Sequence, residues 1–236
     1  MRIECLIKLC PFRSLATHFF FTKSCHNLVR SLSYGGMKNI AYMKTKLAPI
    51  ENPPGMMMKF VYWLSRRQYG KVMTPLKVIT ARLPLSFGMY VAKLEKLEQK
   101  YELPKHVALL VRTHVAQLNS CEFCIDIGKV EAMKHFPDHQ EKIFNVSSYK
   151  TSHLFTTAEK AALLFAEELT MNKKISDPTF TEAQKHFTER ELVEIAWAVT
   201  REHIYNLMNR AFDIESDGLC QIPESHIRRE KAIASA

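Results

Sequence analysis

Apolar residues recur every three or four positions through most of this chain, and that spacing restricts its body to helices. Residues 86–101 show the pattern clearly, with apolar side chains at Phe87, Tyr90, Val91, Leu94 and Leu97. On an α-helix these positions share one face, whereas a half-buried strand needs strict alternation of apolar and polar residues. The body contains no segment that alternates in that way. The sequence therefore predicts an all-α fold.

Two pairs of residues predict where long helices begin. Thr156 with Glu159, and Thr188 with Glu191, have the spacing of a capping box, in which each side chain bonds the backbone N–H of the other residue. An apolar run follows each pair, as expected for a helix that packs on a core. Between the predicted helices, residues 138–154 are mostly polar and are expected to form a connection.

The positive charge of the chain is concentrated near its N-terminus. The 236 residues carry a formal net charge of +9, and residues 1–50 hold eight basic residues and one acid. A basic leader differs from a nucleic-acid-binding face, which places Lys and Arg along one helix, so no nucleic-acid partner is expected. No uncharged apolar run approaches the roughly 18–20 residues that span a bilayer, so no transmembrane segment is expected.

The sequence divides into three predicted parts. Residues 1–42 form a basic N-terminal extension, which we interpret as a targeting segment, a disordered tail or a mis-annotated start. Residues 43–218 form a helical domain, and residues 219–236 form a C-terminal tail. Because two of the six cysteines lie inside the domain, the cysteine usage is typical of a reducing compartment. We expect a cytoplasmic protein, with organellar import if the extension is a genuine transit peptide.

Cys121 and Cys124 have C-x-x-C spacing between two predicted helices. Asn119 and Ser120 are good N-cap residues, so the cysteines are expected in the first turn of the second helix. A helix N-terminus favours the thiolate, which is the form that attacks a peroxide or a disulfide. A structural zinc site normally needs four ligands, and the sequence has no second such pair. The spacing favours redox use, and we expect neither a metal nor a cofactor.

Two stretches carry a family resemblance. The first is residues 111–127, with the run QLNSCEFCID at 117–126. The second begins at Thr156, includes FAEELT at 165–170 and FTERELV at 187–193, and extends to Arg210. Together these stretches resemble the superfamily of carboxymuconolactone decarboxylases and alkyl hydroperoxidase D (AhpD-like) proteins.

This resemblance implies an AhpD-like helical fold that assembles as a homo-oligomer. It also implies reduction of hydroperoxides or disulfides by a dithiol that cycles through a disulfide. By resemblance, Cys124 attacks the peroxide and Cys121 resolves the resulting sulfenic acid. The implied reductant is a thiol protein or a lipoyl-type dithiol, which exchanges with Cys121.

The chain departs from the family's active-site pattern at two positions. The family has a Glu twelve positions before the first cysteine and a His four positions after the second, where this chain has Leu109 and Gly128. Both members of the proton relay are therefore missing. Titratable residues that are candidates to replace them are Glu122, Asp126, His114, Glu191 and His203. Each also has an ordinary interpretation, as a solvated helix acid or a packed histidine.

Two alternative functions stay open. One is a non-redox enzyme like the decarboxylase branch of the superfamily, although that branch does not depend on a C-x-x-C pair. The other is a non-catalytic helical oligomer whose cysteines form a redox-sensing disulfide, which the missing relay favours. Replacement of both cysteines by serine separates these from a dithiol enzyme, because only the dithiol enzyme loses its activity.

Overall fold

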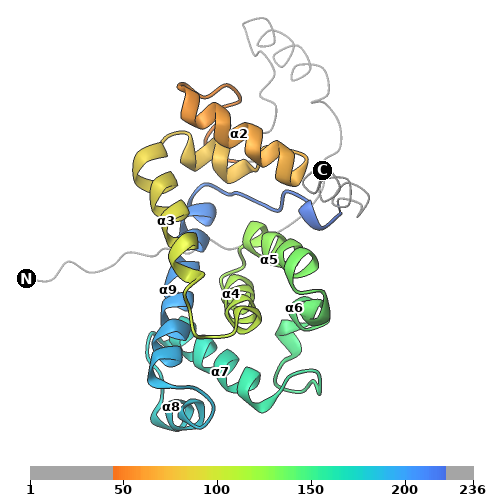
Figure 1. Cartoon of the computed structure of the whole chain (residues 1–236), viewed down its shortest axis with the longest axis vertical. Helices are drawn as coiled ribbons and strands as arrows, with labels where there is room; N and C mark the ends of the chain where they lie inside the picture. The colour runs from red at the N-terminus through yellow and green to blue at the C-terminus, as the bar shows by residue number, and fades with distance from the viewer. Residues whose placement is uncertain (1–44, 222–236) are drawn as a thin grey trace, which may run out of the picture. The chain divides into compact units, whose positions relative to one another are not determined.

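The computed structural model describes residues 45–221, and these residues form helices and no strand (Figure 1). The all-α prediction is confirmed. The predicted extension over residues 1–42 lies outside the described residues, as do residues 222–236 of the predicted tail. The α-helices of the described part are α2 (Met56–Tyr69), α3 (Met89–Glu98), α4 (Lys105–Leu118), α5 (Glu122–His135), α6 (Gln140–Phe144), α7 (Thr157–Asn172), α8 (Asp177–Gln184) and α9 (Glu189–Ala211).

Both predicted capping boxes are confirmed. At the start of α7, Glu159 N donates to Thr156 Oγ1 at 3.1 Å, and Thr156 N donates to Glu159 Oε2 at 2.8 Å. At the start of α9, Thr188 and Glu191 make the same reciprocal pair, at 3.2 Å and 2.8 Å. Each box satisfies two of the backbone N–H groups that a helix leaves unpaired at its N-terminus.

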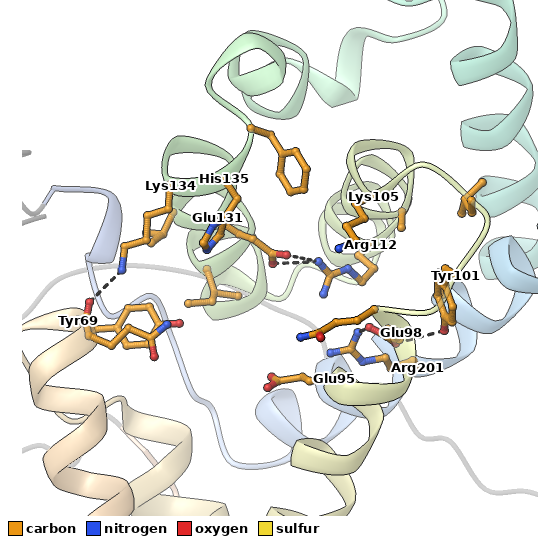
Figure 2. Close-up of a pocket in the computed structure, with 18 residues that line it drawn as sticks. Tyr69, Glu95, Glu98, Tyr101, Lys105, Arg112, Glu131, Lys134, His135 and Arg201 are labelled. Atoms are coloured by element: carbon orange, nitrogen blue, oxygen red, sulfur yellow. Dashed lines mark hydrogen bonds and ion pairs between the residues drawn. The ribbon is translucent and has the colours of Figure 1, made fainter. Parts of the chain in front are cut away.

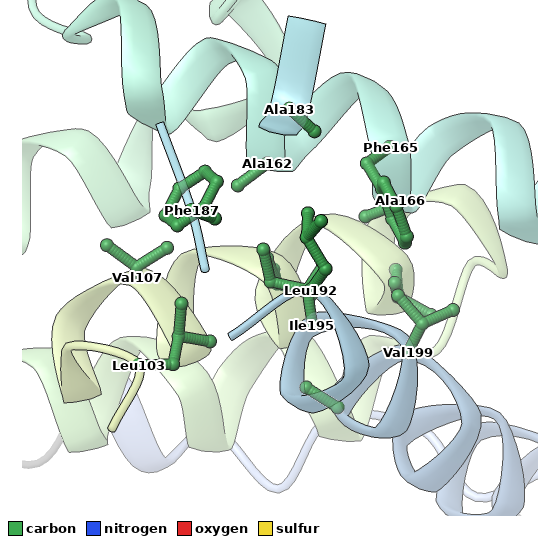
Figure 3. Packing of buried hydrophobic residues seen from close by; sticks show 13 residues of the cluster. Leu103, Val107, Ala162, Phe165, Ala166, Ala183, Phe187, Leu192, Ile195 and Val199 are labelled. Atoms are coloured by element: carbon green, nitrogen blue, oxygen red, sulfur yellow. The ribbon is translucent and has the colours of Figure 1, made fainter. Parts of the chain in front are cut away.

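Helix α4 lies between α5, α7 and α9 and carries one wall of the main core (Figure 1). Val107, Val111 and Val115 on α4 pack against Phe165 of α7 and Ile195 of α9, as Figure 3 shows for most of this cluster. Side chains of this size each contribute roughly 1.5–3 kcal/mol when fully buried. This packing fixes α4 against α7 and α9, and so fixes the end of α4 that leads to Cys121.

The segment over residues 138–154 differs from its prediction as a polar connection. It contains the short helix α6 and two 3₁₀ turns, and it buries Ile143, Val146 and Tyr149 against Leu109 and Leu110 of α4. Each of these turns carries only one or two apolar residues. The pattern was therefore too sparse for a helical period to be recognised.

At Gly128, helix α5 passes close to α4. A Cβ atom at this position would lie 2.7 Å from Thr113 Oγ1, closer than such atoms approach one another. In an isolated helix a glycine costs about 1 kcal/mol relative to alanine. Here the missing side chain permits the close approach of the two helices, which the sequence pattern alone did not indicate.

The chain after α9 returns to α5. Leu219 N and Cys220 N donate to the two carboxylate oxygens of Asp126 at 2.7 and 2.9 Å, and Ser216 Oγ donates to the same group at 3.0 Å. Leu219 is 2% exposed. The packed body therefore extends at least to Cys220, past the predicted boundary at residue 218. Within residues 45–221 no helix combines the length and the hydrophobicity that crossing a bilayer would require.

Candidate active site

Cys121 and Cys124 are joined by a disulfide at the N-terminus of α5, with 5.3 Å between their Cα atoms. Cys121 is the N-cap residue, and its carbonyl oxygen accepts a hydrogen bond from Ile125 N at 3.0 Å. Cys124 is the third residue of the helix. Both sulfur atoms therefore belong to the first turn, where unpaired N–H groups favour negative charge.

The predicted N-cap residues have different roles. Asn119 ends α4 as its C-cap, and Ser120 lies in the left-handed region with a φ of 52°. The connection between α4 and α5 is thus only two residues long before Cys121 takes the cap position. The prediction of Asn119 or Ser120 as the N-cap was wrong, because the tight turn uses both residues to reverse the chain.

The disulfide is buried among apolar neighbours. Cys121 is 1% and Cys124 is 5% exposed, and they cluster with Ala116 of α4, Ile125 of α5 and Tyr205 of α9. Among residues 45–221, one polar side chain hydrogen-bonds to them: Asn209 of α9 donates its Nδ2 to Cys124 Sγ at 3.3 Å and lies 3.8 Å from Cys121 Sγ. A thiolate formed here would be shielded from water and would depend on such a donor.

A second group of polar side chains connects α4 and α9 beside the pair. Asn119 Nδ2 donates to Asn206 Oδ1 at 2.9 Å and lies 3.3 Å from His203 Nδ1. Asn206 Nδ2 in turn donates to Glu202 Oε1 at 2.6 Å. Burial is the main cause that raises the pKa of Glu202, and the nearby Arg112 opposes the shift. Burial likewise lowers the pKa of His203.

The predicted acids on α5 occupy different environments. Glu122 is exposed in the first turn, where its charge suits the helix N-terminus. Asp126 is buried and its carboxylate is taken up by the segment that contains Ser216, Leu219 and Cys220. Although burial alone would raise the pKa of Asp126, these hydrogen bonds outweigh it and lower the pKa. The geometry gives Asp126 a structural task.

His114 and Glu191 lie away from the sulfur atoms. His114 stacks edge-on against Tyr149 and its Nε2 lies 3.5 Å from Glu167 of α7, and burial lowers its pKa. Glu191 is half-buried and belongs to the capping box at the start of α9, whereas Asn209 is in the last turn of that helix. Eighteen residues of α-helix span about 27 Å. The structure therefore does not bring Glu191 to the cysteines.

Sequence reasoning missed Glu202, Asn206 and Asn209, which the structure places on one buried face of α9. Their exposed fractions are 7%, 0% and 4%. The spacing of four and three residues is itself helical, and polar residues at positions that continue an apolar face are unusual. That signal was available in the sequence of α9, next to Ile195 and Val199.

A pocket of about 420 Å³ lies between the end of α2, α3, α4, α5 and α9 (Figure 2). Arg112 is paired with Glu131 at 2.8 Å in its wall, and Arg201 is paired with Glu98. Arg201 Nε also donates to the hydroxyl of Tyr205 at 3.1 Å. Tyr205 in turn packs on the cysteine cluster, so Arg201 links the wall of the pocket to a neighbour of the disulfide.

One further group has the composition of a metal site. Donor atoms of His106, His139 and Glu159 lie within 4.8 Å of one another, and the two imidazole rings stack at 4.0 Å. Lys142 Nζ, however, donates to both oxygens of Glu159 at 2.7 and 2.8 Å. A bound cation would have to displace this ammonium group, so the geometry favours an ion pair.

Comparison with known proteins finds a relative that this chain covers almost completely. No profile of a protein family matches the sequence. YnjA, an uncharacterized protein of Escherichia coli K12, is 31% identical over 182 residues, which cover 75% of this chain and 97% of YnjA. The match therefore includes nearly the whole of the relative.

Solved structures share the fold at lower identity. The debrominase Bmp8 aligns with a TM-score of 0.63 at 16% identity, over 80% of this chain and 100% of Bmp8. A putative antioxidant defence protein AhpD of Agrobacterium tumefaciens aligns with a TM-score of 0.53 at 24% identity, over 59% and 96%. An alkylhydroperoxidase AhpD core protein of Ralstonia eutropha JMP134 gives 0.56 at 18%, over 73% and 96%. The expected AhpD-like fold is confirmed.

Proposed function

We propose that this chain, which belongs to the family of YnjA and has an AhpD-like fold, is a thiol-dependent oxidoreductase. In this proposal Cys121 and Cys124 reduce a hydroperoxide or a disulfide. The observation that carries it is the position of the two cysteines. They are close enough to form a disulfide, they lie in the first turn of a helix, and Asn209 donates a hydrogen bond to one of them.

The proposed reaction consumes two electrons from the dithiol. The Cys124 thiolate attacks one peroxide oxygen, so that an S–O bond forms while the O–O bond breaks, and the leaving alkoxide takes a proton to become an alcohol. The Cys121 thiolate then attacks the sulfenic acid of Cys124, which releases water and forms the disulfide. An external dithiol attacks the sulfur of Cys121 and restores both thiols by exchange. With a disulfide substrate, the Cys124 thiolate attacks one sulfur of the substrate instead of a peroxide oxygen, and the other sulfur leaves as a thiolate.

The family's proton relay has no equivalent at its two usual positions. Leu109 is buried with Ile143 and Leu163 in an apolar cluster, and Gly128 has no space even for a Cβ atom beside Thr113. Proton supply to the leaving group therefore depends on other groups or on water. We expect slower turnover than in proteins that have the relay.

This pocket is the proposed approach for the substrate. Since both sulfur atoms are buried, a reactant needs a path, and Tyr205, a half-buried neighbour of the disulfide, accepts a hydrogen bond from Arg201 in the wall of the pocket. Rotation of its ring would open that path. Replacement of Tyr205 by alanine is expected to increase the rate with a bulky hydroperoxide more than the rate with hydrogen peroxide.

Assembly and partners are also proposed. Large apolar side chains are exposed along α2, with Met56 at 83%, Phe60 at 61% and Trp63 at 49%. Apolar exposure of this extent on one helix supports a homo-oligomer. We propose the cytoplasm as the compartment, because its reducing thiols keep a dithiol of this kind active.

A redox-sensing disulfide without turnover is the second candidate function. The burial of both sulfur atoms favours it, because a sensor needs no room for a substrate. A sensor would be oxidised once and would not be reduced by a dithiol during steady-state measurement. The two candidates therefore differ in turnover.

Steady-state turnover tests the proposal. The assay follows consumption of hydrogen peroxide, cumene hydroperoxide and a small disulfide, with dihydrolipoamide as the reductant. The other cysteines are first replaced by serine; they are Cys5, Cys10, Cys25 and Cys220. Multiple turnovers that are lost on Cys124→Ser and on Cys121→Ser support the proposed enzyme. Turnover that survives both changes contradicts the proposed dithiol mechanism, and a single oxidation without turnover supports the sensor.

A further inference from the structure

Among residues 45–221, the side chain of Asn209 is the one that donates a hydrogen bond to the cysteine pair. It is 4% exposed, and its Nδ2 lies 3.3 Å from Cys124 Sγ and 3.8 Å from Cys121 Sγ. The two distances are unequal, so the hydrogen bond is made chiefly to Cys124. In the disulfide, sulfur is a weak hydrogen-bond acceptor. A buried amide that donates to such an acceptor needs an explanation.

The backbone around Asn209 holds this amide in place. The Asn209 carbonyl oxygen accepts from Ile214 N at 3.0 Å, in a turn where Asp213 adopts a left-handed φ of 52°. The next residue, Arg210, donates its Nη1 to the carbonyl oxygen of Ser120 at 2.8 Å. The last turn of α9 is therefore tied both to the segment that follows it and to the residue that precedes Cys121.

The hydrogen bond is stronger after the disulfide is reduced. A thiolate carries a full negative charge, and hydrogen bonds to charged acceptors are roughly twice as strong as those between neutral groups. In a buried site the thiolate also lacks water that could replace the amide. A donor that is fixed near one sulfur therefore favours ionisation of that sulfur over its neighbour.

Charged and titratable groups on the surrounding helices bond or approach groups other than the two sulfur atoms, or face solvent. Glu202 bonds Asn206, His203 lies between Asn119 and Thr170, and Tyr205 accepts from Arg201. Arg210 bonds Ser120, Asp126 bonds the C-terminal segment, Arg112 pairs with Glu131 and His114 approaches Glu167. Glu122 points into solvent. Among residues 45–221, none of these groups has a described hydrogen bond to either sulfur atom.

We infer that Asn209 stabilises the Cys124 thiolate and thereby makes Cys124, not Cys121, the attacking cysteine. This role rests on the proposed dithiol chemistry. The relay residues are replaced by Leu109 and Gly128, which cannot stabilise charge, and Asn209 stabilises the charge on sulfur instead. An amide neither gains nor loses a proton near neutral pH. Asn209 therefore stabilises the negative charge on sulfur by its hydrogen bond. It does not accept the thiol proton, which is transferred to a different acceptor.

Two variants test the inference in a chain whose only cysteines are Cys121 and Cys124. Asn209→Leu keeps the volume and removes the donor, while Asn209→Asp keeps the shape and places a carboxyl group beside the sulfur. The measurement is the rate of iodoacetamide alkylation of reduced protein between pH 5 and 10. Mass spectrometry assigns each adduct to Cys124 or Cys121. Thermal unfolding followed by circular dichroism confirms that each variant folds.

The expected result is a rise of one pH unit or more in the pKa of Cys124 in Asn209→Leu, with at least tenfold slower alkylation at pH 6. Asn209→Asp is expected to raise the same pKa at least as far, because its carboxylate repels the thiolate. Cys121 should change less in both. Asn206→Leu is the matched control: it removes a buried amide one turn earlier on the same face that bonds no sulfur, and it should leave the pKa of Cys124 unchanged.

The outcomes separate this inference from the proposed function. An unchanged pKa of Cys124 in both Asn209 variants overturns the role of Asn209, even if the parent turns over a hydroperoxide. An equal effect of Asn206→Leu also overturns it, because general loosening of α9 would then explain the change. A pKa that depends on Asn209, in a protein that turns over no hydroperoxide or disulfide, supports the role of Asn209 and overturns the proposed enzyme.

Discussion

Replacement of Gly128 by alanine is predicted to destabilise the protein, against the ordinary preference of helices. In an unhindered helix interior, Gly→Ala stabilises by about 1 kcal/mol. In this structure a Cβ at residue 128 would lie 2.7 Å from Thr113 Oγ1, and Thr113 is 1% exposed, so it has no open space to move into. Packing an extra group into a filled interior costs about 1–3 kcal/mol.

The difference of these two effects gives a net loss of about 1 kcal/mol, within a range of roughly 0–2 kcal/mol. Replacement of Thr113 by alanine removes the obstructing atom and leaves no orphaned partner, because its hydroxyl bonds no other group among the described residues. In that background Gly128→Ala is predicted to stabilise by up to about 1 kcal/mol. The sign of the effect therefore reverses.

Equilibrium unfolding in urea of the parent, both single variants and the double variant measures this coupling. The expected coupling free energy is about 1–3 kcal/mol. Additive effects, with a coupling below about 0.5 kcal/mol, would refute the close approach of α4 and α5 at Gly128. The same steric argument predicts that Gly128→His cannot restore the family's relay histidine by a single substitution.

Three further predictions follow from the site. Asp126→Ala should lower the free energy of unfolding by about 2–4 kcal/mol in urea, because it leaves the N–H of Leu219 unpaired. Because the pKa of Asp126 is lowered in the folded protein, its contribution to the free energy of unfolding is present above the usual carboxyl pKa and is lost as the pH falls through the folded pKa. Asp126→Ala should therefore lose less stability on acidification than the parent does. Glu202 has a raised pKa in the folded protein, so the parent's stability should fall as the pH rises from the usual carboxyl pKa to the folded pKa. In melting temperatures measured between pH 4.5 and 8, Glu202→Gln should show a smaller fall than the parent. Glu191→Ala should cost roughly 0.5–1 kcal/mol of stability through its capping box and leave the rate of thiol oxidation unchanged, which a relay role would not allow.

Local signals in the sequence predicted the helices well. The two capping boxes are short-range patterns, and each begins a helix at the predicted residue because its hydrogen bonds involve only the first turn. The position of the cysteines in the first turn of α5 was predicted for a similar reason. The failures were also local: α6 was too short to show a period, and the turn before Cys121 used both predicted cap residues to reverse the chain.

Long-range contacts could not be predicted from these patterns. Asp126 was a candidate relay group because it is near the cysteines in sequence, yet its partners are about ninety residues away, in the segment that follows α9. Asn209 lies in the stretch that carries the family resemblance, but it was not proposed as a site residue because nothing in its local sequence connects it with Cys124, 85 residues earlier. Gly128 was interpreted as the position of the missing relay histidine, whereas the absence of a side chain there is explained by Thr113 on another helix.

The central claim is that Cys121 and Cys124 act as a working dithiol, and a count of free thiols tests it most directly. The fully reduced protein, with serine at Cys5, Cys10, Cys25 and Cys220, is mixed with one equivalent of hydroperoxide, and the thiols and the alcohol product are measured together. The account predicts rapid loss of two thiols for each molecule of alcohol formed, and no rapid loss in Cys124→Ser. Thiols that persist for many minutes, or that disappear equally fast in Cys124→Ser, would contradict it.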